Sequence, residues 1–109
     1  MKEELKDLEK KLGHIALANV MKFMLSNNWS AKAVSEALGE HRGWLSLRIN
    51  GNVQPWLGEF FFRVDAKLLM KREDLTQTLW IDNTYGGDPL KAIDDLHAQI
   101  NRYSKNRKP

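Results

Sequence analysis

Apolar and polar residues alternate with a helical period along nearly the whole chain. Apolar positions recur every three or four residues, and this spacing gives a helix one apolar face. The only run with strand character, Trp80-Ile81, is short and isolated, so the pattern predicts an all-α fold. The expected helices cover residues 3–12, 16–26, 31–38, 41–49, 56–70, 71–80 and a last segment that starts after Asp88.

The expected helix ends carry residues suited to starting or stopping a helix. Ser30 precedes the helix at 31–38 as an N-cap, because its hydroxyl can accept a hydrogen bond from a free amide of the first turn. Gly39 follows that helix and suits a left-handed helix end. Asn50-Gly51 ends the next helix, and Asp88 with Pro89 begins the last one.

Residues 30–55 therefore predict a capped two-turn helix, a glycine turn and a second short helix. Ser35 is small and lies where the two helices would cross closely. An apolar seam joins them, and a helix-turn-helix requires this arrangement. The seam residues are Val34, Leu38, Leu45 and Ile49.

This segment resembles the Cro and lambda-repressor-like family, also called Xre-like. The resemblance rests on Ser30, Val34, Ser35, Leu38-Gly39, Leu45, Asn50-Gly51 and Pro55. A helix before the motif and an apolar helix after it match the five-helix layout of the family. The resemblance covers about residues 14–75 and implies a DNA-binding domain there. The residue pattern adds a helical extension at 1–13 and a C-terminal loop, amphipathic helix and basic tail at 76–109, which fall outside the resemblance.

The family resemblance implies a sequence-specific transcriptional regulator, which we expect to be a repressor of phage or bacterial type. It would place helix 41–49 in the major groove of double-stranded DNA as a homodimer. Arg42 is the first choice for a base contact, Ser46 the second, and Leu47 could touch a thymine methyl group. The full set expected at the DNA is Ser30, Ala31, Lys32, His41, Arg42, Gly43, Ser46, Leu47, Asn50, Asn52 and Gln54.

Three apolar surfaces compete as the dimer interface. The stripe of Leu5, Leu8 and Leu12 fits either an extension packed on the domain or a short two-stranded coil. Phe62 lies off the main apolar face of its helix and fits either a sandwiched position in the monomer or a contact with a second subunit. The stripe of the last helix needs a partner surface, in its own domain or in another chain, through Leu90, Ile93, Leu96 and Ile100.

Composition narrows the function classes further. The 109 residues include no cysteine and carry a formal net charge of +3, which excludes disulfides and only mildly favours anionic partners. No signal sequence or apolar span is visible, so we expect a cytoplasmic protein. The three histidines lack metal-ligand spacing, so we expect neither an enzyme nor a cofactor. The alternative function is a protein-interaction module, such as an antitoxin or a phage accessory protein.

Overall fold

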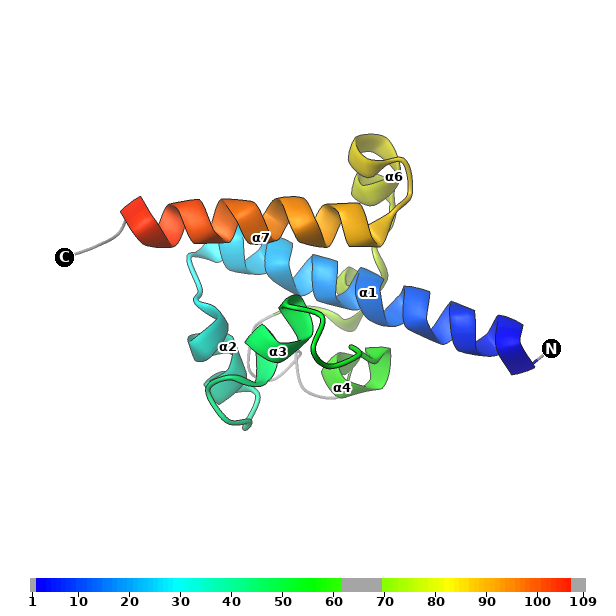
Figure 1. Ribbon diagram of the computed structural model, residues 1–109, viewed down its shortest axis with the longest axis horizontal. Helices are drawn as coiled ribbons and strands as arrows, with labels where there is room; N and C mark the ends of the chain where they lie inside the picture. The colour runs from blue at the N-terminus through cyan, green and yellow to red at the C-terminus, as the bar shows by residue number, and fades with distance from the viewer. Residues whose placement is uncertain (1, 62–69, 107–109) are drawn as a thin grey trace.

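The computed structural model describes residues 2–61 and 70–106 and shows only helices over these two ranges (Figure 1). The predicted all-α class is therefore confirmed for the described part of the chain. None of the described helices is long and apolar enough to cross a membrane. The elements are α1 (Lys2–Asn27), α2 (Ala31–Ala37), α3 (Trp44–Ile49), α4 (Leu57–Phe61), the 3-10 helix η1 (Arg72–Thr76), α6 (Leu79–Tyr85) and α7 (Pro89–Asn106).

Helix α1 is one continuous helix of 26 residues, whereas the pattern predicted separate helices at 3–12 and 16–26. Gly13, at the expected break, is helical and buried. A Cβ atom at this position would lie 2.0 Å from the carbonyl oxygen of Pro55, so the glycine allows the loop before α4 to approach the helix backbone. The expected boundary between an extension at 1–13 and the domain thus falls inside α1.

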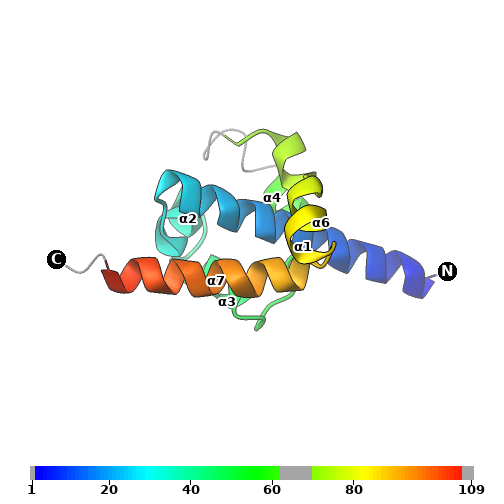
Figure 2. The same cartoon turned by 90° about the horizontal axis from the view of Figure 1, so that it is seen from above.

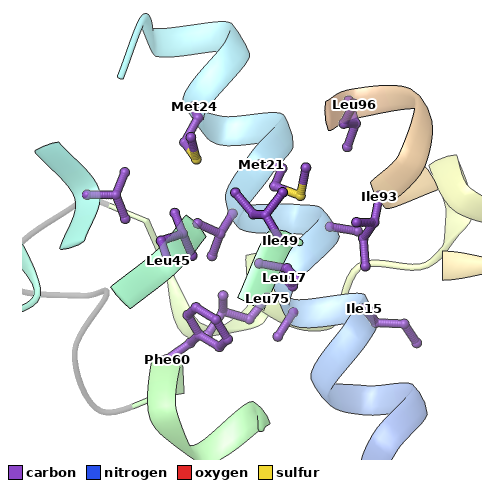
Figure 3. Packing of buried hydrophobic residues seen from close by; sticks show 14 of the residues in the cluster. Ile15, Leu17, Met21, Met24, Leu45, Ile49, Phe60, Leu75, Ile93 and Leu96 are labelled. Carbon is purple, nitrogen blue, oxygen red and sulfur yellow. The ribbon is translucent and has the colours of Figure 1, made fainter. Parts of the chain in front are cut away.

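The core forms around the second half of α1, which contacts both the motif helices and α7. Leu17 and Met21 of α1 pack with Leu45 and Ile49 of α3 and with residues of α7 in one buried cluster (Figure 3). Helix α7 runs alongside α1 in the same direction (Figures 1 and 2). One core therefore joins residues on both sides of the boundary expected at 75–76.

The stripe of α7 finds its partner within the chain, which corrects part of the expected dimer interface. Ile93 and Leu96 are each only 5% exposed because they pack in the core beside α1. Ile100 is half-buried against the same cluster, and Leu90 alone is largely exposed. Phe62, the other expected interface residue, lies outside the described residues.

The segment predicted as one helix at 71–80 is instead η1 followed by α6. The carboxylate of Asp74 accepts a hydrogen bond from the amide of Lys71 at 3.0 Å and caps the tight 3-10 turn. Extended backbone at Gln77 (φ −63°, ψ 129°) then interrupts the helical phase. One helix over 71–80 would turn both Leu75 and Leu79 inward. Leu75 is buried, but Leu79 is 68% exposed, because the interruption turns it away from the core.

The side chain of Asn19 attaches η1 and α6 to α1. Its amide nitrogen donates to the carbonyl oxygens of Leu75 at 2.9 Å and Gln77 at 3.0 Å, and its oxygen accepts from the indole nitrogen of Trp80 at 2.9 Å. Asn19 is 5% exposed, so these hydrogen bonds replace the ones to water that its side-chain amide loses on burial.

Candidate nucleic-acid interface

The first motif helix begins and ends as the sequence predicted. Asn28 adopts a left-handed conformation (φ 62°) and ends α1, close to the end of the helix expected at 16–26. The Ser30 hydroxyl accepts a hydrogen bond from the amide of Ala33 at 3.0 Å, which confirms the predicted N-cap of α2. The chain is therefore turned sharply between α1 and α2.

The turn after α2 is a Schellman motif built on Gly39. The amide of Glu40 donates to the carbonyl of Ser35, and the amide of Gly39 donates to that of Glu36, both at 3.0 Å. Gly39 has a φ of +81°, a conformation that residues with a side chain rarely adopt. This glycine sets the direction in which the chain enters α3.

Ser35 joins the two motif helices through a hydrogen bond as well as through its small size. Its hydroxyl donates to the carbonyl of Ala31 at 2.8 Å and accepts from the amide of Leu45 at 3.0 Å. Helix α3 has Gly43 at its N-cap position and therefore no side-chain cap of its own. The fully buried Ser35 supplies the missing acceptor from α2 and fixes the start of α3.

Helix α3 starts at Trp44, three residues later than the expected start at His41. The imidazole Nδ1 of His41 accepts from the amide of Gly43 at 3.2 Å, and the His41 carbonyl accepts from the amide of Trp44 at 3.0 Å. This local turn competes with helix formation, which glycine at 43 already disfavours. His41 and Arg42 consequently lie on the turn before α3 and not on its first helical turn.

Arg48 is bonded within the chain and clamps α3 to α4. Its guanidinium makes two hydrogen bonds with the carboxylate of Glu59, at 2.8 and 3.0 Å, and a third with the carbonyl of Trp44 at 2.9 Å. It also stacks 4.0 Å from the centre of the Trp44 ring, which packs edge-on against Phe60. The arginine side chain is only 9% exposed, so this buried contact fixes the position of α3 on α4.

The remaining side chains of this region separate into an outer and an inner set. The exposed residues of the expected DNA-binding set are Ser30, Lys32, His41, Arg42, Leu47, Asn50 and Asn52, and the half-buried ones are Ala31, Gly43, Ser46 and Gln54. Lys32 approaches Glu36 at 4.0 Å on the open surface, a contact that contributes little. The side-chain nitrogen of Gln54 donates to the carbonyl of Pro55 at 3.2 Å.

A pocket of about 220 Å³ brings four of the expected residues together with α7. Ser30 and Ala31 at the start of α2 lie across it from Ser46 and Asn50 of α3. Its third wall belongs to the second half of α7, and its apolar floor includes Met24 of α1. Arg42 and Leu47 do not line this pocket, so the expected set is divided between the pocket and the outer surface.

The sequence interpretation missed His97 and Asn101 of α7, which line this pocket, and it assigned Ile100, which also lines it, to the apolar stripe of the last helix. The spacing of that stripe gave no sign of the segment that these residues would face. The parallel packing of α7 on α1 places them beside the motif helices. Only the tertiary arrangement could have identified them.

Comparison of the chain with protein-family models, curated proteins and solved structures found no match. The functional argument therefore depends on the residues of this chain alone.

Proposed function

We propose that this protein is a sequence-specific, dimeric DNA-binding regulator that inserts α3 and the turn before it into the major groove. One observation carries the proposal. The bonds of Ser35 and Arg48 hold α3 in place, and the outer side of the same unit keeps Arg42, Leu47 and Asn50 exposed. A short helix whose packed face is fixed by hydrogen bonds and whose opposite face is exposed suits base recognition in a groove.

Arg42 is the principal base-reading residue in this proposal. It is exposed on the turn ahead of α3, and within the described part of the chain its side chain makes no salt bridge. A guanidinium can form two hydrogen bonds with the edge of guanine. Leu47, 36% exposed one turn further along, can contact a thymine methyl group. Ser46 becomes a weaker candidate than the sequence suggested, because it faces the pocket shared with α7.

Phosphate contacts come from the edges of the same surface. Asn50 and Asn52 are exposed after the end of α3, and Lys32 is exposed on α2. The loop at 50–54 carries no basic side chain, so the electrostatic share of binding is modest. A dimer with about six phosphate contacts gives a slope near −5 when log affinity is plotted against log salt concentration.

Selection of bound sequences from a random duplex library tests this function directly. We expect an enriched sequence with two-fold symmetry. Arg42→Ala should weaken binding to that sequence about tenfold and relax the preference at one base pair. Lys91→Ala is the matched control, because it removes one exposed positive charge from the first turn of α7. No enrichment, together with equal effects of the two variants, would contradict the proposal.

A second candidate function is protein binding at the surface where α1 meets η1 and α6. Leu79 is 68% exposed and borders a hollow lined by Phe23, Met70 and Trp80. An exposed apolar side chain beside an apolar hollow is a feature of protein contact sites. If this surface is the functional one, Leu79→Glu abolishes formation of a protein complex while Arg42→Ala leaves it unchanged, and the selection yields no preferred duplex.

A further inference from the structure

The first turns of α1 form an arm that extends beyond the rest of the molecule (Figure 1). Every residue from 4 to 11 is exposed, including two large apolar ones: Leu5 is 61% and Leu8 is 52% exposed. Leu12 continues this stripe and is half-buried where the arm meets the domain. Burial of these exposed leucine side chains against another apolar surface would be favourable.

The apolar surface of the arm continues onto the domain. Leu12 shares a shallow hollow with Trp56, which precedes α4, and Leu57, the first residue of α4, and Glu9 also lines this hollow. Trp56 is 41% exposed, an unusual degree for a side chain of that size. The stripe and the tryptophan together make an elongated apolar surface with charged edges.

We propose that this arm pairs antiparallel with the arm of a second copy of the chain. In a heptad frame, Leu5 and Leu12 occupy a positions and Leu8 occupies the d position. The flanking g positions are then Glu4 and Lys11, and the flanking e position is Glu9. These flanking charges set the direction in which two such helices pair.

The charge pattern favours the antiparallel pair over the parallel one. In a parallel pair each g residue faces the next e residue, so Glu4 would face Glu9 of the partner subunit and the two carboxylates would repel. In an antiparallel pair g residues face each other, so Glu4 would face Lys11 of the partner subunit. This favourable contact occurs twice and centres the pair near Leu8, within the exposed part of the apolar stripe.

The resulting spacing also suits the DNA-binding function proposed above. Ile49 of α3 packs beside Met21 of α1 (Figure 3). With a rise of about 1.5 Å per residue, the thirteen steps from Leu8 to Met21 place each α3 about 20 Å from the pair centre. Two copies would then be about 39 Å apart along α1, a few ångströms more than one turn of DNA. This match rests on the proposed function, whereas the pairing of the arms does not.

Sedimentation equilibrium of the full chain and of the double variant Leu5→Glu, Leu8→Glu tests the pairing. We expect a concentration-dependent dimer whose dissociation constant rises about 100-fold in the variant, because four leucines leave the interface. Both leucines lie outside the core of the monomer, so at concentrations well below the dissociation constant of the original dimer, circular dichroism should show the same helix content and melting for both chains. A chain that stays monomeric at about 1 mM, or a dimer that the double variant leaves intact, would overturn the proposal.

Charge reversals test the direction of pairing. Glu4→Lys and Lys11→Glu should each weaken the homodimer about tenfold, because two attractions become repulsions. An equimolar mixture of these two variants should form a heterodimer as tight as the original dimer. Lys10→Glu is the matched control, since the adjacent f position points away from the partner and should change little. A parallel pair would instead be strengthened by Glu4→Lys, and this result would refute the antiparallel arrangement.

The two proposals can fail separately. If the chain dimerises through the arm but selection yields no preferred DNA, the pairing holds and the DNA-binding function is wrong. If the leucine variant is monomeric and still binds a single half-site with the Arg42 dependence described above, the function holds. A dimer that resists both the leucine and the charge variants would assign self-association to another surface and refute the arm.

Discussion

The helix-turn-helix unit and the α1 arm differ in where their side chains find partners. In the unit, the hydroxyl of Ser35 and the guanidinium of Arg48 are used inside the molecule and fix the position of α3. In the arm, Leu5 and Leu8 find no partner within the described part of the chain and remain in water. The unit therefore presents an exposed surface on a helix whose position is fixed by internal hydrogen bonds. The arm instead presents apolar side chains that a second apolar surface would bury.

The largest effect is expected at Gly13, where the arm joins the domain. Gly13→Ala should destabilise the fold by about 3 kcal/mol, because the new methyl group would lie within 2.0 Å of the Pro55 carbonyl oxygen and one backbone must move. Gly58→Ala is the matched control: its Cβ would meet nothing within 4 Å, and the substitution should be neutral or slightly stabilising. Urea unfolding measures both. Equal stability of the two variants would show that the arm is not fixed to the domain at this contact.

The clamp beneath α3 should show the next largest effect. Arg48→Met should lower the free energy of unfolding by about 2 kcal/mol, because it removes the positive charge that is paired with the half-buried carboxylate of Glu59. Arg42→Met removes the same charge from the exposed turn and should change stability by less than about 0.5 kcal/mol. The affinities for selected DNA, measured well below the unfolding temperature, should show the reverse order. If Arg42→Met destabilised the chain as strongly as Arg48→Met, the distinction between a structural Arg48 and an exposed Arg42 would be wrong.

Ser35→Ala should have a smaller effect on the same unit. The substitution leaves the buried amide of Leu45 without an acceptor and should destabilise by about 1–2 kcal/mol. Ser46→Ala, on the half-buried side of α3, should cost less than about 0.5 kcal/mol. Thermal unfolding followed by circular dichroism compares the two. A neutral Ser35→Ala would mean that small size alone determines its place in the motif.

The smallest effect concerns the attachment of α6 to α7 and is confined to high pH. A hydrogen bond to the Asp95 carboxylate, helped by burial and by repulsion from that charge, raises the pKa of Tyr85 to about 12. Because the folded state holds the proton more tightly than the unfolded state, this contribution to stability is intact below pH 10 and is lost as the pH rises towards 12. Absorbance titration in a Tyr103→Phe background should show a late transition that Asp95→Asn moves to lower pH. An identical transition in both chains would contradict the bond.

The local signals of the sequence predicted much of the unit. Ser30 as a cap, Gly39 as a left-handed turn and Ser35 at the helix crossing are all found in the structure, because each depends on residues close by in the chain. The same reasoning placed the start of α3 too early. It did not foresee that the imidazole of His41 would bond the amide of Gly43 and form a turn there.

Contacts between distant residues account for what the sequence could not predict. The pattern predicted separate helices at 3–12 and 16–26, and nothing near Gly13 in the sequence shows that Pro55 packs on it within one continuous helix. Leu79 looked buried because its spacing from Leu75 ignores the interruption at Gln77. The pocket residues of α7 depend on its parallel packing along α1, which periodicity alone does not specify.

Amide chemical-shift mapping of the ¹⁵N-labelled chain with its selected duplex tests the central claim most directly. At a concentration where the arms are already paired, the largest changes are expected at residues 42–50, with smaller ones at the start of α2 and little change at residues 4–11. Changes confined to α6 and the first turn of α7, with none at residues 42–50, would contradict the claim that α3 and its preceding turn form the DNA-binding surface.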